Sequence, residues 1–213
     1  MGKSIYLIAL VATIAIFAVI FFNVKAFEDS RFSSLSNDLR QIEFENNLER
    51  FYDNFKNTDS NVYCSLTEES ISNAITKLSN MEVSLDAYKQ PMLSSEYIFT
   101  KKNFLLTNMV LFYRVKEALN DCNLNIKPVI YFYAEDNSCE VDCGIIVDQL
   151  EGIKSVCPEV RIFAFPFNSE DFKFTQLFEK KYSISKPATL IINDKKIDSL
   201  QSTDVLLKEL GCN

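Results

Sequence analysis

The sequence predicts a mixed α/β domain that follows a helical region and an N-terminal transmembrane helix. Three observations predict this arrangement. An uncharged apolar segment runs from Ser4 to Val24. Apolar residues then recur every three or four positions over residues 34–120, which is the period of an α-helix. From Lys127 onward, short apolar runs alternate with helical patterns, as in a sheet covered by helices. We therefore divide the chain into residues 1–26, 27–125 and 126–213.

The composition argues against several classes of function. The chain has 213 residues, a net charge of -7 and no histidine. Without histidine, a Ser-His-Asp or Cys-His catalytic group and a His-ligated metal site are excluded. The acidic balance disfavours binding to nucleic acid, and the sequence contains no glycine-rich phosphate-binding motif. We expect no cofactor, no bound metal and no nucleic-acid partner.

The apolar segment Ser4–Val24 is long enough to cross a bilayer as a helix, which needs about 20 residues. Lys3 precedes it and acidic residues follow it closely, so the positive-inside rule favours a cytoplasmic N-terminus. The alternative is a cleavable signal peptide, because Val24-Lys25-Ala26 resembles a small-x-small cleavage site. Both interpretations place residues 27–213 outside the cytoplasm, where disulfides form and persist. We favour a single-pass membrane protein.

Three helices are predicted before residue 126, over residues 34–57, 65–91 and 95–120. The polar residues 58–61 separate the first two helices. Ser65 and Glu68 have the spacing of a capping box at the start of the second helix, and Pro91 ends it. The region is interpreted as a spacer and packing layer.

The second and third helices are joined by a short turn and should pack antiparallel. Cys64 lies just before the second helix and Cys122 just after the third. The two cysteines would then meet at the open end of the hairpin. We expect a Cys64–Cys122 disulfide, although six cysteines allow other pairings.

From Lys127 to Cys212 the predicted order of elements is β-α-β-α-β-β-α. Strands are predicted over residues 128–133, 160–167, 187–192 and 195–198. Helices are predicted over residues 139–155, 169–182 and 202–210. Residues 128–133 are a continuous apolar run, which is typical of a strand buried on both faces. Residues 160–167 are interpreted as a second buried strand.

This order resembles the thioredoxin-like fold. Cys139 and Cys143 lie where the first strand meets its helix, and Pro187 opens the third strand, where these proteins place a cis-proline. The resemblance implies thiol–disulfide exchange, with Cys139 as the attacking and Cys143 as the resolving cysteine. It also implies that the Lys186 backbone and Pro187 bind a substrate chain. A disulfide between Cys157 and Cys212 is expected too, because the first and last helices of this fold share one face of the sheet.

Two local effects act on the cysteine pair in opposite directions. A helix N-terminus lowers the pKa of a cysteine thiol. Acidic residues lie at positions 135, 136, 140 and 142, and nearby carboxylates raise a thiol pKa. A strongly oxidising disulfide is therefore disfavoured, and a reductase, an isomerase or a stable structural disulfide fits better.

Three functions follow from this pattern. The leading hypothesis is a membrane-anchored enzyme that exchanges disulfides with exported proteins through Cys139 and Cys143, together with a membrane redox partner. The alternative is a non-catalytic binding module with structural disulfides, because the spacing is C-x-x-x-C rather than the usual C-x-x-C. The third is Cu(I) handling, because this spacing in an anchored thioredoxin-like domain also resembles the Sco copper chaperones. Their additional histidine ligand is missing here.

Overall fold

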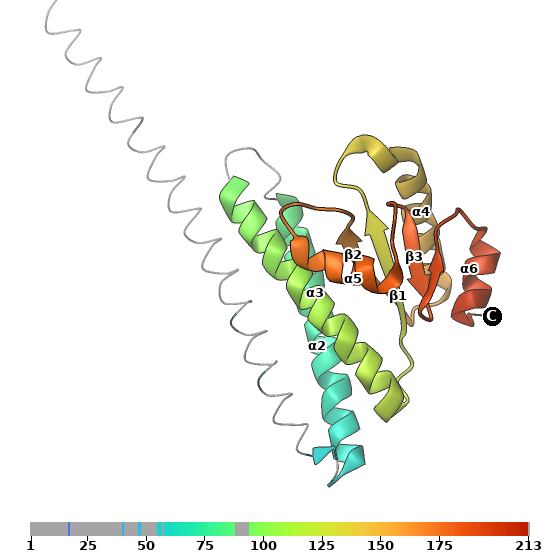
Figure 1. The fold of residues 1–213 in the computed structure, drawn as a ribbon. Helices are drawn as coiled ribbons and strands as arrows, with labels where there is room; N and C mark the ends of the chain where they lie inside the picture. The colour runs from blue at the N-terminus through green and yellow to red at the C-terminus, as the bar shows by residue number, and fades with distance from the viewer. Residues whose placement is uncertain are drawn as a thin grey trace, which may run out of the picture. The chain divides into compact units, whose positions relative to one another are not determined.

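The computed structural model describes residues 58–87 and 94–212, together with residues 17, 40, 47, 55 and 56. Residues 47–213 form one compact unit, so the predicted boundary at residue 125 lies inside it. The helices and strands of this unit are α2 (Ser60–Ala87), α3 (Ser94–Cys122), β1 (Lys127–Tyr133), α4 (Glu140–Val156), β2 (Val160–Pro166), α5 (Gln176–Tyr182), β3 (Thr189–Ile192), β4 (Lys195–Ile197) and α6 (Thr203–Leu210) (Figure 1).

The strands form one mixed sheet with the order β2-β1-β3-β4. β1 and β2 run parallel, while β1 pairs antiparallel with β3 and β3 pairs antiparallel with β4. Val129 of β1 lies opposite Ile162 of β2 on one side and Ile192 of β3 on the other. The mixed α/β architecture that the alternating pattern predicts is therefore confirmed.

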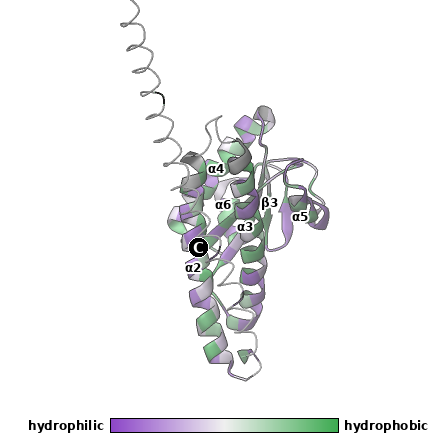
Figure 2. Cartoon of the chain, turned by 90° about the vertical axis from the view of Figure 1, so that its left-hand side faces the viewer, coloured by the Kyte–Doolittle hydropathy of each residue, from purple (hydrophilic) through white to green (hydrophobic). Residues whose placement is uncertain are grey.

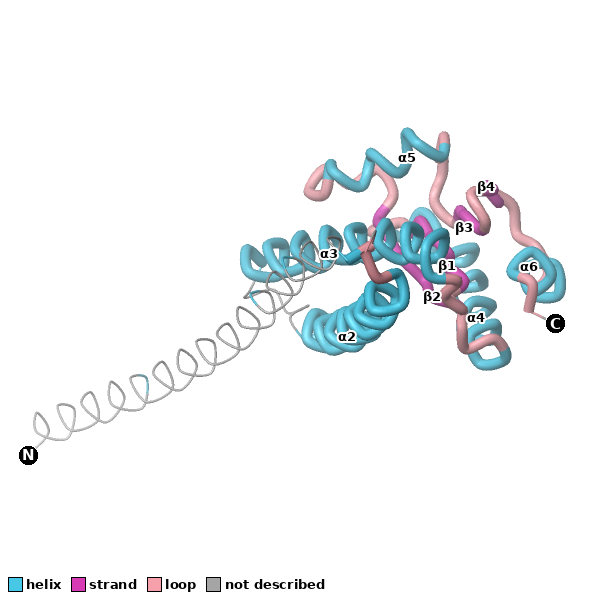
Figure 3. Tube along the Cα trace, turned by 90° about the horizontal axis from the view of Figure 1, so that it is seen from below, coloured by secondary structure: helices cyan, strands magenta, loops and turns pink. Residues whose placement is uncertain are grey.

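Successive side chains of a strand point to opposite faces of the sheet, and β1 follows this rule. Val129 and Tyr131 pack with residues of α4 and α6, among them Ile146, Leu150, Ile153, Leu206 and Leu210. On the other face, aromatic rings from α3 and α5 gather over the sheet. The centroid of the Phe112 ring lies 5.3 Å from that of Phe163 and 5.4 Å from that of Phe178. Figure 3 shows α4 and α5 on opposite sides of the strands.

Helices α2 and α3 lie side by side as a long hairpin (Figure 1). Both alternate between hydrophilic and hydrophobic residues (Figure 2), and their buried apolar residues include Ile71, Leu78, Met81, Leu105 and Leu111. Burial of one apolar stripe is the usual source of stability for such helices. The hairpin therefore belongs to the packing layer that the sequence predicts.

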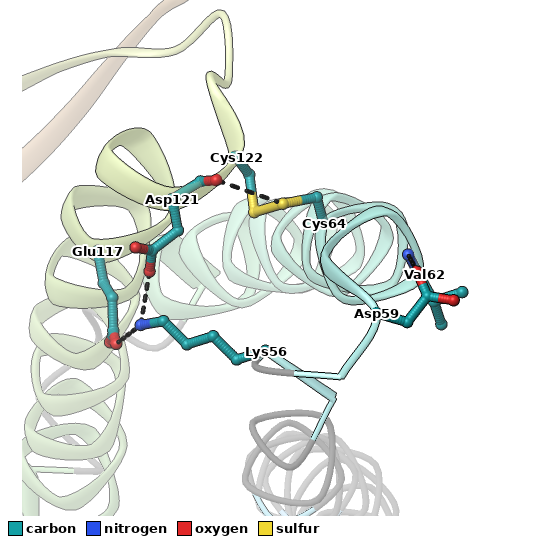
Figure 4. The surroundings of a disulfide bond; sticks show 7 residues. All are labelled: Lys56, Asp59, Val62, Cys64, Glu117, Asp121 and Cys122. Carbon is teal, nitrogen blue, oxygen red and sulfur yellow. Dashed lines mark hydrogen bonds and ion pairs between the residues drawn. A yellow bond between two sulfur atoms is a disulfide. The ribbon is translucent and has the colours of Figure 1, made fainter.

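A disulfide joins Cys64 to Cys122 at the open end of this hairpin, with a Cα–Cα distance of 5.2 Å. This is the pair expected from the antiparallel arrangement. Beside it, Lys56 Nζ donates to Glu117 Oε1 at 3.1 Å and lies 2.7 Å from Asp121 Oδ2 (Figure 4). Hydrogen bonds to these two carboxylates, with Asp121 the stronger partner, raise the pKa of Lys56. The disulfide and the ion pairs together hold the start of α2 against the end of α3.

Two predicted helix starts are wrong. α2 begins at Ser60 rather than at Ser65, because Asp59 Oδ1 accepts a hydrogen bond from Val62 N at 3.1 Å. An aspartate at this position is a good N-cap, so part of the predicted break is a helix start. The helix predicted from Ser169 begins only at Gln176, after a 3-10 turn. The Ser169 hydroxyl donates to Glu135 Oε2 at 2.7 Å and caps no helix.

The predicted membrane anchor, residues 4–24, lies outside the described residues apart from Phe17, as does most of the predicted helix over 34–57. Pro91 lies outside them as well. Among the helices that the structure describes, none is both long and apolar enough to span a bilayer. The anchor remains a prediction from the sequence.

Candidate functional site

The candidate site is the disulfide between Cys139 and Cys143, where the loop after β1 enters α4. The Cα–Cα distance of the pair is 5.3 Å. Cys139 ends a 3-10 turn and is the N-cap of α4, with φ -128° and ψ 16°. Residues four apart lie on the same face of a helix, so the C-x-x-x-C spacing brings both sulfurs to one side of the first turn.

The two cysteines differ in exposure, and the difference is the reverse of what the resemblance implies. Cys139 exposes only 6% of its surface, whereas Cys143 is half-buried and packs at the margin of the core between α4, α6 and the sheet. An attacking cysteine needs access to its partner. The burial of Cys139 therefore does not suit the attacking role expected for it.

Tyr131 lies beneath the first turn of α4. Its hydroxyl donates to the backbone oxygen of Cys143 at 3.3 Å, and the side chain belongs to the buried core. Burial, followed by the effect of the neighbouring Tyr133, raises the pKa of Tyr131 to about 12. The phenol is therefore protonated at neutral pH and remains a donor. Strand β1 thus holds the backbone of Cys143 directly.

A partly buried lysine contacts the loop that leads from β1 to the disulfide. Lys101 of α3 exposes 16% of its side chain, and its Nζ lies 2.6 Å from Glu135 Oε1. The ammonium group also lies over the rings of Tyr97, Tyr133 and Phe172, at 5.6, 5.9 and 5.4 Å from their centroids. Cation–π contacts of this kind are attractive. The lysine ties the disulfide-bearing loop to the helical hairpin.

Burial and neighbouring groups shift the pKa values of Lys101 and Tyr133. Burial lowers the pKa of Lys101, but Tyr133 and the hydrogen bond to Glu135 outweigh it, so the pKa is raised overall. Burial raises the pKa of Tyr133 to about 12, against the opposing effect of Lys101. At neutral pH the lysine is therefore charged and the tyrosine neutral.

The acidic residues around the disulfide are not equivalent. Glu135 is paired with Lys101, and Asp136 accepts hydrogen bonds from the hydroxyl and the backbone N–H of Ser138. The hydroxyl bond, followed by the backbone bond, lowers the pKa of Asp136. Glu140 and Asp142 are exposed in the first turn of α4. The carboxylates at 140 and 142 are therefore the ones whose charge acts on the helix start, where negative charge is stabilising.

Lys186 and Pro187, the expected substrate-binding residues, lie in the turn before β3. The resemblance places a cis-proline at the position of Pro187, but the peptide bond before Pro187 is trans. The trans form is the more stable isomer before proline, and the chain turns through Ala188, whose φ is 55°. The Lys186 carbonyl already accepts a hydrogen bond from Thr189 Oγ1 at 2.9 Å. Substrate binding by Lys186 and Pro187 remains a prediction.

The third disulfide joins Cys157, at the end of α4, to Cys212, just after α6. This is the pair that the resemblance implies. Lys127 Nζ donates to Gly211 O at 2.6 Å and lies 3.6 Å from Cys212 Sγ. Gly211 has φ 65° and ends α6 in a left-handed conformation, which glycine adopts without strain. This disulfide joins the C-terminal ends of α4 and α6, whereas Cys139 lies at the N-terminal end of α4.

A cleft of about 270 Å³ opens at the other end of the sheet. Its walls include Phe112, Lys116, Lys127, Ile130, Ile191 and Asp194. Lys127 begins β1, whereas the disulfide follows the end of β1. The walls of the cleft include Lys127, Pro128 and Ile130 from the first half of β1 and no residue of the loop that leads from β1 to the disulfide. The two features are distinct.

Within the described part of the chain, no group of three or more His, Cys, Asp or Glu side chains could hold a metal ion. Soft Cu(I) sites can be built from two thiolates, but in the structure both sulfurs of the candidate pair are bonded to each other. The arrangement gives no support for the copper interpretation.

Similarity to known proteins does not add to this description. Comparisons with models of protein families, with curated proteins and with solved structures found no match for this chain. A functional interpretation therefore depends on the disulfide and its surroundings.

Lys101, Tyr133 and Ser169 were not predicted to belong to the site. Lys101 lies in the first part of α3 and is 34 residues from Glu135 in the sequence, and Ser169 follows β2. The acidic residues after β1 were the available signal, because a carboxylate such as Glu135, whose side chain is 33% exposed, gains from a nearby cation. The sequence pattern does not show which lysine supplies it.

Proposed function

We propose that the chain is a membrane-anchored, extracytoplasmic thiol–disulfide oxidoreductase of the reductase or isomerase type. It would act on exported proteins through Cys139 and Cys143, and a membrane redox partner would exchange electrons with it. The observation that carries the proposal is a disulfide at the start of α4, directly after the central strand β1. The sheet order β2-β1-β3-β4 supports a thioredoxin-like fold, which the sequence resembles.

The chemistry of exchange fits this position. A helix N-terminus has unpaired N–H groups and a partial positive charge, which favour the thiolate over the thiol. Thiolate attack on a disulfide needs neither histidine nor a cofactor. A chain without histidine can therefore carry out this reaction.

The proposed compartment is supported by two observations. The segment Ser4–Val24 is long and apolar enough to anchor the chain, and all six cysteines of the sequence are paired in the structure. Disulfides are typical of extracytoplasmic proteins and rare in the cytosol. The anchor would hold the enzyme at the membrane next to its substrates.

A non-catalytic binding module is the second candidate, and a specific observation favours it. Cys139 is 6% exposed, and buried disulfides are often structural. In this case the Cys139–Cys143 bridge would stabilise the start of α4, and the protein would act by binding a partner. Fold alone does not decide between an enzyme and a binding module.

A redox titration of the full-length protein in detergent tests the proposal. The protein is equilibrated with thiol–disulfide buffers, its free thiols are alkylated, and all six cysteines are assigned by mass spectrometry. Reversible titration of Cys139–Cys143 alone, between about -120 and -270 mV, is the expected result. Reduction only below about -300 mV, together with the other two disulfides, would support the binding module instead.

A further inference from the structure

We infer that Cys143, and not Cys139, is the cysteine that forms the mixed disulfide with a substrate protein; this inference rests on the proposed function. The rate of exchange depends on access to the sulfur that takes part. Cys139 exposes 6% of its surface, whereas Cys143 is half-buried. Because Cys143 is the more accessible cysteine, it takes the first step of the exchange. The resemblance implies the opposite order, with Cys139 attacking first.

Cys143 packs at the margin of the core, and the surface of α4 beside it is exposed. Gly144 follows it, and a Cβ added there would meet no atom within 4 Å. Val147, four residues after Cys143 and therefore on the same face of α4, exposes 40% of its surface, and Glu140, three residues before it, is also exposed. On the inner side, the Tyr131 hydroxyl holds the Cys143 carbonyl. A polypeptide can therefore approach Cys143 across this exposed surface while β1 holds its backbone in place.

Cys139 is suited to the second role. It is the N-cap of α4, and its side chain makes no capping hydrogen bond while it is part of the disulfide. The unpaired N–H groups of the first turn stabilise negative charge at this position. A thiolate of lowered pKa is also the better leaving group in exchange. Cys139 therefore fits a buried cysteine that resolves the mixed disulfide and departs when the pair is opened.

The reaction proceeds in two steps. The Cys143 thiolate attacks a substrate disulfide, so a Cys143–substrate S–S bond forms, the substrate S–S bond breaks, and one substrate sulfur leaves as thiolate. The Cys139 thiolate then attacks Cys143 Sγ, which closes the Cys139–Cys143 bond and releases the second substrate thiolate. The substrate gains the two electrons that the dithiol loses. A dithiol donor, the proposed membrane redox partner, returns the pair to its reduced form.

Trapping with single-cysteine variants tests this assignment. Reduced full-length Cys139→Ser and Cys143→Ser proteins in detergent are each incubated with a fluorescent peptide that carries one internal disulfide, and covalent adducts are measured on non-reducing gels. Cys139→Ser keeps the accessible thiol and lacks the resolving one. It should accumulate at least about tenfold more adduct than Cys143→Ser, because exchange follows access to the thiolate. The double variant Cys139→Ser/Cys143→Ser gives the background from the other cysteines.

The outcomes separate this inference from the proposed function. An equal or larger amount of adduct with Cys143→Ser would overturn the assignment while leaving the oxidoreductase intact. Adduct at the background level with both variants would overturn both. Should Cys139→Ser fail to fold, the wild-type protein still gives an answer. After selective reduction of the pair, iodoacetamide should modify Cys143 before Cys139, and the opposite order would refute the inference.

Discussion

At the scale of single residues, Lys101 links the helical hairpin to the loop that carries the disulfide. Its ammonium group is paired with Glu135 and surrounded by three aromatic rings. Replacement of Lys101 by methionine keeps most of the side-chain volume but leaves Glu135 without its cation. A half-buried carboxylate that loses its partner is costly. The lysine therefore contributes to stability through charge rather than through packing alone.

We predict that Lys101→Met lowers the free energy of unfolding by about 1–2 kcal/mol, between the values for exposed and buried ion pairs. The double variant Lys101→Met/Glu135→Gln should recover part of this loss, because it removes the unpaired charge. Urea unfolding at pH 7 measures both. Lys102→Met, at the exposed neighbouring position, is the matched control and should change stability by less than about 0.5 kcal/mol. Equal effects of Lys101→Met and Lys102→Met would argue against the role of the ion pair.

At the scale of elements, the three disulfides close loops of very different length. Cys64–Cys122 and Cys157–Cys212 join residues 58 and 55 positions apart, whereas Cys139–Cys143 joins residues only four apart. A cross-link limits the unfolded chain more strongly when the loop is longer. The first two bridges are therefore placed to stabilise the fold, and the third contributes less to stability.

We predict that the Cys64→Ser/Cys122→Ser variant loses about 4 kcal/mol of unfolding free energy and the Cys139→Ser/Cys143→Ser variant about 2 kcal/mol, from loop entropy. Both are compared with wild type by urea unfolding without a reductant. The ratio of the two losses of unfolding free energy is the more informative result, because native-state geometry modifies each loss. A loss for Cys139→Ser/Cys143→Ser as large as that for Cys64→Ser/Cys122→Ser would indicate a mainly structural bridge and weaken the proposed enzyme.

Elements that are determined by their own sequence could be predicted, and those that depend on distant partners could not. β1 is a continuous apolar run from Pro128 on, and β2 and β3 are largely apolar. All three form strands whose residues are buried or partly buried. The hydroxyl of Ser169 has a suitable position for a helix cap, but Glu135, 34 residues away, accepts its hydrogen bond. Ser202 does precede α6 as predicted, yet its side chain makes no capping hydrogen bond.

In the candidate site, too, local features could be predicted from the sequence and features that depend on distant contacts could not. The sequence pattern places Cys139 and Cys143 at a strand–helix junction, and the structure has them there. Their relative exposure depends on how the loop folds over the sheet, which local patterns do not encode. The resemblance places a cis-proline at the position of Pro187, whereas the peptide bond before Pro187 is trans. Residue types and spacing thus predict the pair, while tertiary packing decides which cysteine is accessible.

At the scale of the whole molecule, one carboxylate connects three parts of the fold. Asp194, in the turn between β3 and β4, accepts hydrogen bonds from Lys116 of α3 at 2.5 Å and from Tyr182 of α5 at 2.9 Å. These contacts lie at the end of the sheet opposite the disulfide, beside the cleft. Together with Lys101 at the other end, they fix α3 to the sheet at two points.

The hydrogen bond from Lys116 is the main reason why the pKa of Asp194 is lower than its ordinary value of 3.8. A carboxyl whose pKa is lower in the folded state stabilises the fold above its unfolded pKa, and this contribution is lost as the pH falls through the folded pKa. Both side chains are substantially exposed, at 34% and 54%. Screening by solvent therefore limits the effect of the pair to about 1 kcal/mol or less.

We predict that Asp194→Asn is less stable than wild type from about pH 5 to pH 7, and that the difference shrinks below about pH 4 as Asp194 of the wild type becomes protonated. Urea unfolding measured from pH 2 to pH 7 follows the difference. Glu170→Gln, at an exposed carboxyl, controls for the general change in net charge. A difference that stays constant down to pH 2 would mean that Asp194 acts through turn geometry rather than charge. Equal stability of Asp194→Asn and wild type at pH 7 would mean that the hydrogen bonds of Asp194 with Lys116 and Tyr182 do not stabilise the packing of α3 on the sheet.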